Sequence, residues 1–122
     1  MVFLDANIIL ELILERQKFQ AVENIIRATD DHAISMLTVH LIMYFGIKNG
    51  VNAETLYGFI GGYKVLDISQ SDYRWAKKYC HGSDFEDALQ VACAVRSGAK
   101  QFITLDKTLA NLYKKSIPML TV

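Results

Sequence analysis

Short apolar segments alternate with longer helical ones along the whole chain, and this alternation restricts the fold more than any other feature. Strands are expected at residues 1–4, 33–36, 63–68, 101–104 and 117–122. Helical periodicity and capping residues predict helices between them, at 7–15, 19–29, 37–45, 52–59, 69–79, 83–96 and 106–113. Strands joined by helices form parallel sheets covered on both faces. The chain is therefore predicted to be an α/β protein, a three-layer α/β/α sandwich around a central, mainly parallel sheet of about five strands.

Several residues predict where individual elements begin and end. Gly46 and Gly50 are expected to stop the helix that starts at residue 37. Ser71 is a possible cap for the helix over 69–79, and Ser83 with Glu86 forms a capping box at the start of the next helix. Pro118 marks the last strand as an edge strand, because proline cannot donate a ladder hydrogen bond.

Length and composition indicate one ordinary globular domain over residues 1–122. Apolar residues make up 52% of the 122 and charged residues 21%, which excludes a disordered or low-complexity chain. The longest apolar run is broken by Glu11 and Glu15, so no membrane span is expected. The first residues, MVFLDANIIL, lack the basic start of a secretory signal, and a cytoplasmic protein is expected. The two cysteines, Cys80 and Cys93, are interpreted as ordinary thiols.

Acidic residues fall where an open parallel sheet binds its ligands, beyond the carboxyl ends of the strands. Asp5 ends the first strand, Asp106 follows the fourth by two residues, and Asp84 and Asp87 share one face of the preceding helix. Each could simply cap a helix, but two carboxylates about 5 Å apart repel by roughly 3 kcal/mol at an effective dielectric constant of 20. If Asp5, Asp87 and Asp106 converge, a shared proton or a hard divalent cation such as Mg²⁺ or Mn²⁺ must relieve that repulsion. Metal-assisted phosphoryl chemistry is the natural interpretation.

The charge distribution is compatible with a nucleic-acid substrate but does not require one. Thirteen basic and thirteen acidic residues cancel, which argues against a domain that coats nucleic acid. Setting aside the four aspartates leaves thirteen basic against nine acidic residues, a balance of plus four. Arg74, Lys77 and Lys78 share one helix face, which is either solvated or contacts phosphates, and Trp75 and Tyr79 either pack in the core or stack on bases.

Three stretches resemble the PIN domain, a nuclease family that includes the VapC-type toxins of toxin–antitoxin pairs. The opening VFLDANIIL is similar to the first strand and first acid of the family, and ISMLTVHLIMYFG to its second strand and following helix. The stretch DFEDALQVACAVRSGAKQFITLDKTL resembles its most recognisable segment. The resemblance implies Mg²⁺- or Mn²⁺-dependent cleavage of single-stranded RNA. It makes Asp5, Asp87 and Asp106 the metal-binding catalytic acids, with Asp84 as an auxiliary metal ligand. Asn7, Ser35 and Thr104 are implied to be polar supports of that site.

One departure from the family pattern opens an alternative. A Glu usually stands at the end of a Thr-x-x-Glu run, and here Leu41 occupies that position. The chain could therefore be a degenerate PIN domain with weak or no nuclease activity that acts through partner binding. The resemblance also implies an antitoxin partner and a homodimer. An apolar groove beside the helix over 7–15, which is apolar almost all round, would suit such a partner.

Overall fold

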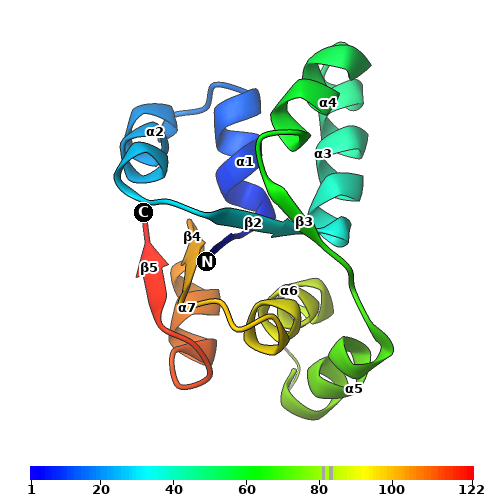
Figure 1. Ribbon diagram of the computed structural model, residues 1–122, viewed down its shortest axis with the longest axis vertical. Coiled ribbons are helices and arrows are strands. Elements are labelled where there is room, and N and C mark those ends of the chain that lie inside the picture. Colours follow the sequence, from blue (N-terminus) through cyan, green and yellow to red (C-terminus); the bar gives the residue numbers. More distant parts are fainter. Residues whose placement is uncertain (81, 83) are drawn as a thin grey trace.

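The computed structural model describes residues 1–80, 82 and 84–122, and it contains a five-stranded parallel sheet (Figure 1). The strands are β1 (Val2–Leu4), β2 (His32–Ser35), β3 (Lys64–Leu66), β4 (Gln101–Thr104) and β5 (Met119–Thr121). Their order across the sheet is β3-β2-β1-β4-β5, and each neighbouring pair is parallel. The predicted fold class is confirmed, and β5 is an edge strand as Pro118 indicated.

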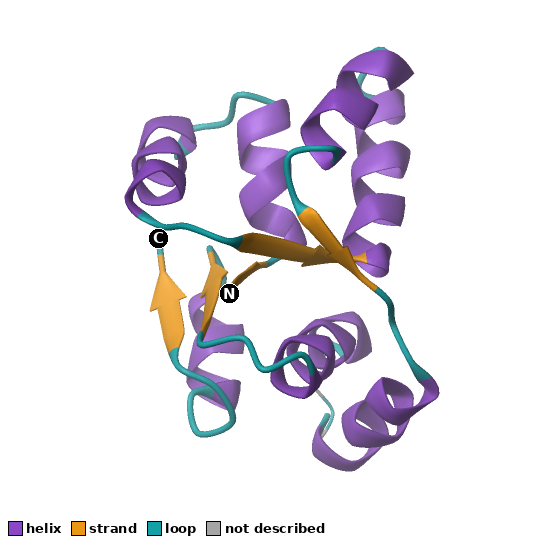
Figure 2. Ribbon diagram, viewed as in Figure 1, coloured by secondary structure: helices purple, strands orange, loops and turns teal. Residues whose placement is uncertain are grey.

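Helices cover both faces of the sheet and complete the three layers (Figure 2). One layer holds α1 (Ala6–Ile13), α2 (Phe19–Ala28), α3 (Met36–Lys48) and α4 (Ala53–Ile60). The other holds α5 (Gln70–Tyr79), α6 (Phe85–Arg96) and α7 (Lys107–Tyr113). None of the helices in the described ranges combines the length and the hydropathy that a membrane span needs.

Alternating side chains of the central strands supply both halves of the core. Val2 and Leu4 pack in the cluster under α1 to α4, whereas Phe3, between them, packs in the cluster with α5 to α7. On β4, Ile103 packs in the first of these clusters and Phe102 in the second. The rings of Phe3 and Phe102 stack with their centroids 5.2 Å apart, which ties β1 to β4 at the centre of the sheet. Burial on both faces explains why β1 is apolar at every position and why β4 has apolar residues at its centre, Phe102 and Ile103.

The strand order changes direction beside β1, and this creates a crevice. From β1 the chain builds outward through β2 to β3, then crosses by α5 and α6 to β4 on the other side of β1. In open α/β sheets the carboxyl ends of the two strands at such a switch point border the ligand-binding crevice. Asp5 follows β1 and Asp106 follows β4, so both acids lie at this point.

Of the two glycines predicted to stop this helix, Gly46 does not end it, whereas Gly50 directly follows its end. Helix α3 continues through Gly46 to Lys48 and ends at Asn49, with Gly50 following at a φ of 81°. A Cβ on Gly46 would lie 2.6 Å from Cδ2 of the fully buried Leu56 on α4. Glycine is therefore present at this position because it lets α3 and α4 approach closely, and it does not terminate the helix.

One predicted helix cap also differs from the cap in the structure. Ser69, not Ser71, caps α5 and forms a reciprocal capping box with Asp72. Asp84 caps α6 by accepting a hydrogen bond from the backbone of Glu86 at 2.8 Å. The predicted cap Ser83, and with it the predicted capping box, lies outside the described residues. Strand β2 ends at Ser35, one residue before the predicted limit, because Ser35 caps α3.

Candidate functional site: a carboxylate cluster at the sheet switch point

Asp5 is a buried acid held by two hydrogen bonds at the end of β1. Its side chain is only 4% exposed. One carboxylate oxygen caps α1 by accepting from the backbone of Ala6 at 2.8 Å, and the other accepts from the hydroxyl of Thr104 at 2.8 Å. Burial raises the pKa of Asp5 to about 6 against the effect of these bonds, and the negative charges of Asp106 and Glu86 raise it further.

Thr104 connects the acids of the two central strands. Its fully buried hydroxyl donates to Asp5 and accepts from the backbone of Asp106 at 3.0 Å. It also accepts from the side-chain amide of Asn7 at 3.3 Å, while the amide oxygen of Asn7 accepts from the backbone of Leu105 at 3.2 Å. Asn7 and Thr104 therefore fix the turn after β4 against the start of α1.

The other three aspartates line one cavity of about 450 Å³ beside this turn. Asp84 and Asp87 come from the first turn of α6, and Asp106 caps α7 by accepting from the backbone of Leu109 at 3.1 Å. The walls of this acid cavity are completed by residues of α7 and one glycine, namely Gly82, Thr108, Leu109, Leu112 and Tyr113. Partial burial raises the pKa of Asp87 to about 7, and the charges of Asp5, Asp84, Asp106 and Glu86 raise it further. The negative charges of Asp5, Asp84 and Asp106 therefore all act on Asp87.

Glu86 also belongs to this cluster, although the sequence predicted only a helix-capping role for it. The pKa of Glu86 is raised by partial burial and by the charge of Asp84, while a positive charge on His40 counteracts the rise. Its charge in turn raises the pKa values of Asp5 and Asp87. His40 lies exposed on α3, next to the half-buried Leu41. The sequence signal for Glu86 was its position between Asp84 and Asp87 in one helical turn.

Ser35 supports α6 through a buried polar network. Its hydroxyl donates to Gln90 at 2.6 Å, and the Gln90 amide donates to the hydroxyl of Thr38 at 2.7 Å. All three side chains are fully buried or nearly so. Gln90 lies one turn after Asp87, so this network fixes the helix that presents Asp87. Gln90 and Thr38 were not predicted, although Gln90 is the one strongly polar residue within the stretch 88–95 of α6.

The donor chemistry of the cluster suits a hard divalent cation, because its side chains offer carboxylate oxygens. Within residues 1–80, 82 and 84–122, however, no group of three or more His, Cys, Asp or Glu side chains is close enough together to hold a metal ion. Binding of a cation would therefore require these carboxylates to move closer to one another. Burial raises the pKa values of Asp5 and Asp87, and the negative charges of neighbouring acids raise them further; a cation would relieve this second effect.

A Thr104→Val variant tests the role of the connecting hydroxyl. The substitution keeps the shape of the side chain but removes the donor to Asp5 and the acceptor for Asp106, so we expect a loss of about 1–3 kcal/mol in the free energy of unfolding. The pKa of Asp5 should rise above about 6, because the Thr104 bond lowers it. Urea unfolding and carboxyl NMR titration measure the two effects. Thr104→Ser keeps the hydroxyl and is the control, and equal stability of the two variants would contradict this role.

Comparison with known proteins identifies the family. A family model described as the PIN domain matches residues 2–115. The chain belongs to the PIN domain family. PIN domains are generally nucleases and are typically dependent on divalent metals, which agrees with a cluster of acids at the switch point. A comparison with curated proteins found no match to this chain.

Solved structures share the fold of this PIN domain at low sequence identity. A toxin–antitoxin complex from Klebsiella pneumoniae is 20% identical over 99% of this chain and 97% of that one, with a TM-score of 0.78. The VapC20 toxin of Mycobacterium tuberculosis, described as cleaving the sarcin–ricin loop, is 10% identical over 91% and 94%, with a TM-score of 0.76. VapBC-1 from nontypeable Haemophilus influenzae is 16% identical over 99% and 98%, with a TM-score of 0.72.

Proposed function

We propose that this PIN domain is a metal-dependent endoribonuclease that cleaves single-stranded RNA, as the toxin of a toxin–antitoxin pair. One observation carries the proposal: Asp84, Asp87 and Asp106 line a single cavity at the switch point of the sheet, and Asp5 is electrostatically coupled to Asp87 and Asp106. These residues are far apart in the sequence. Capping requires one acid at each helix, and it does not explain why their charges are gathered at one place.

In this proposal Asp5, Asp87 and Asp106 are the catalytic acids and hold Mg²⁺ or Mn²⁺, with Asp84 as a further metal ligand. When bound, the ion polarises the phosphodiester and activates the attacking water. Thr104 and Asn7 orient Asp5 and the backbone of Asp106, and Ser35 supports Asp87 through Gln90. Because carboxylates bind metal only when deprotonated, the raised pKa of Asp87 makes ion binding weaker below about pH 7.

An antitoxin partner is supported by a groove on the other layer of the protein. Helices α1, α2 and α4 enclose about 490 Å³ there, and Leu12, Phe19, Ile26 and Phe59 supply an apolar lining. Glu15, Glu23 and Arg27 add charges to it. Such a surface suits an amphipathic helical segment, which places apolar anchors at helical spacing. The solved structures of similar fold include toxin–antitoxin complexes. A homodimer, a cytoplasmic location and a single domain over 1–122 stay predictions.

The degenerate alternative is favoured by two observations. Leu41 lies half-buried on α3 at the position where the family usually has Glu. Among the described residues, no group of three or more His, Cys, Asp or Glu side chains is close enough together to hold a metal ion. On this alternative the groove between α1, α2 and α4 carries the function and the acid cavity carries none.

Cleavage of an unstructured RNA in the presence of Mn²⁺ or Mg²⁺ tests the proposal against the alternative. We expect the wild type to cleave and Asp5→Asn to lose at least about a hundredfold in rate, because removing even an outer partner of a metal ligand typically costs 10- to 100-fold. EDTA should abolish cleavage by the wild type. Equal cleavage by the wild type and by Asp5→Asn, purified identically, would assign the activity to a contaminant or another site. No cleavage by the wild type with either metal would establish the degenerate alternative.

A further inference from the structure

The beginning of helix α6 lies between two cavities. Asp84 and Asp87 face the acid cavity, whereas Leu89 lines a second cavity of about 470 Å³. Because successive helical residues are rotated by about 100°, Asp87 and Leu89 point to nearly opposite sides of the helix. A chain that crosses the start of α6 would therefore meet the acids on one side and this second cavity on the other.

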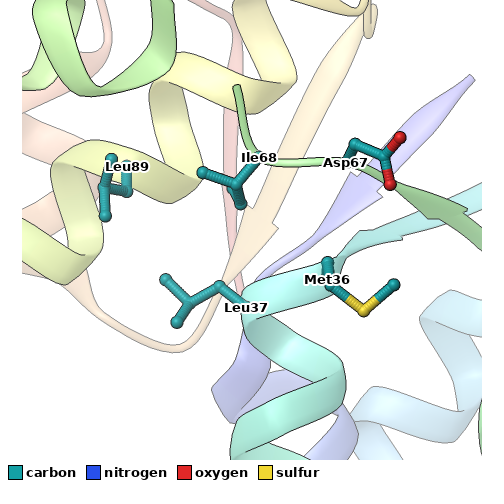
Figure 3. Close-up of a pocket in the computed structure, with 5 residues that line it drawn as sticks. All are labelled: Met36, Leu37, Asp67, Ile68 and Leu89. Carbon is teal, nitrogen blue, oxygen red and sulfur yellow. The ribbon is translucent and has the colours of Figure 1, made fainter. Parts of the chain in front are cut away.

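The second cavity lies at the same edge of the sheet as the acids, and its interior is apolar. Met36 and Leu37 directly follow β2, and Asp67 and Ile68 directly follow β3. Figure 3 shows Leu37, Ile68 and Leu89 pointing toward a shared space, while the carboxylate of Asp67 points away from it. Its volume is within the range typical of small-molecule pockets. We call the space between Leu37, Ile68 and Leu89 the apolar cavity.

Two exposed aromatic rings, Phe85 and Tyr73, contact each other at the start of α6, on the side of the helix that carries Leu89. Phe85 lies one turn before Leu89 on the same face of α6 and is adjacent in sequence to Asp84. Its ring packs edge to face against that of Tyr73 on α5, with 6.0 Å between centroids. Phe85 is 39% exposed and Tyr73 is 50% exposed, so much of both rings remains open to solvent.

Basic side chains lie on the same helix as Tyr73. Arg74, Lys77 and Lys78 are exposed on α5, and Lys77 is one turn from Tyr73 on the same side. In the part of the chain that the structure describes, no ion pair neutralises Arg74, Lys77 or Lys78. Exposed aromatic rings next to unpaired positive charge are the combination by which proteins bind unpaired nucleic acid. A purely apolar partner would leave these charges without a counterpart.

We propose that Tyr73, Phe85 and the apolar cavity hold an unpaired base of the RNA chain, while the basic side of α5 contacts its phosphates. This inference rests on the proposed function, because the same strand must also enter the acid cavity. Helix α6 with its side chains is about 10 Å thick, so the base belongs to a nucleotide beside the cleaved bond and not to the bond itself. Stacking on aromatic rings tolerates any base, so the surface selects unpaired RNA and not a particular sequence.

Binding without cleavage tests the inference directly. Fluorescence anisotropy of a labelled, unstructured oligoribonucleotide is measured in EDTA. We expect Tyr73→Ala and Phe85→Ala each to weaken binding at least about fivefold, as loss of one stacked base does. Phe85→Trp should keep wild-type affinity, because its ring still stacks. Tyr57→Ala is the matched control, since Tyr57 is 55% exposed on α4 in the opposite layer and should not affect binding.

An oligomer of the same length with abasic sugars separates stacking from charge. It should bind the wild type and Phe85→Ala equally, and a fivefold difference there would overturn the role of the base. Wild-type RNA affinity in both alanine variants would overturn the inference as well. If sedimentation velocity then showed that these variants convert a dimer into monomers, the surface would be an interface between copies.

The cleavage assay keeps this inference distinct from the proposed function. If both alanine variants cleave RNA with an unchanged KM and Asp5→Asn does not cleave, the proposed base-binding surface is contradicted and the proposed nuclease activity is supported. If both alanine variants bind RNA more weakly and the wild type does not cleave, the proposed base-binding surface is supported and the proposed nuclease activity is contradicted.

Discussion

An Asp87→Asn variant is expected to lose RNA cleavage and yet to unfold at a higher temperature than the wild type in metal-free buffer at pH 8. The folded protein raises the pKa of Asp87 from 3.8 to about 7, so folding is opposed wherever this carboxyl is ionised. The full shift corresponds to about 4 kcal/mol, and screening at this half-exposed group reduces it to about 1–2 kcal/mol. A gain of that size should raise Tm by about 5 °C.

The stability advantage of Asp87→Asn over the wild type should increase with pH. Because the folded-state pKa of Asp87 lies above its unfolded value, its contribution to stability falls as pH rises from about 4 to about 7. Asparagine stays neutral throughout, so the gain in the free energy of unfolding of Asp87→Asn over the wild type should be complete at pH 8 and absent near pH 4. Differential scanning fluorimetry in EDTA at both pH values measures the difference.

A metal ion should reverse this order of stabilities. Mn²⁺ at about a hundred times its Kd would stabilise the wild type by about 2.7 kcal/mol, and it should stabilise Asp87→Asn much less. Glu54→Gln changes an exposed acid on α4 and is the control, with no expected change in activity or in its response to pH. An Asp87→Asn protein that is less stable than the wild type at pH 8 would contradict the repulsion among these acids.

A Gln90→Ala variant is expected to lose about 3–4 kcal/mol in the free energy of unfolding. The substitution removes both hydrogen bonds of the buried Gln90 side chain and leaves the hydroxyls of Ser35 and Thr38 without this partner. Each lost hydrogen bond between these buried groups costs about 1 kcal/mol, and the cavity left by the side chain adds to that loss. Urea denaturation of the purified variant measures the effect.

A second substitution separates the loss of stability caused by the missing hydrogen bonds from the loss caused by the cavity, and a third is the control. Gln90→Met fills most of the volume without making the hydrogen bonds, so its loss should be smaller than that of Gln90→Ala by the cost of the cavity. Gln70→Ala changes an exposed glutamine at the start of α5 and should stay within about 0.5 kcal/mol of the wild type. A loss for Gln90→Ala as small as that of Gln70→Ala would show that the network contributes nothing to stability.

The elements of the fold follow from local patterns in the sequence, whereas several of their limits do not. Apolar segments such as Val2–Leu4 are too short to be anything but buried strands between helices, and all five were predicted. The error at Gly46 arose because a residue with low helix propensity is retained in α3 for its contact with Leu56, and sequence spacing does not reveal that contact. The capping box of Ser69 and Asp72, by contrast, was a readable signal that the choice of Ser71 overlooked.

In the candidate site, too, some residues could be predicted from the sequence and others could not. Asp5, Asp84, Asp87 and Asp106 were predicted because the rule that ligands bind at the carboxyl ends of parallel strands selects them. Glu86, Gln90 and Thr38 were not, because their roles depend on which groups lie opposite them after folding.

By itself the sequence determined the alternation of strands and helices, and therefore a parallel sheet with acids after its strands, since hydrophobic period and capping act between residues a few positions apart. Only the tertiary structure decided that α6 presents Asp84 and Asp87 to the cavity that contains Asp106, and that Asp5 is buried enough to raise its pKa to about 6. Burial and charge repulsion depend on distances through space between segments up to a hundred residues apart, and a linear pattern does not contain those distances.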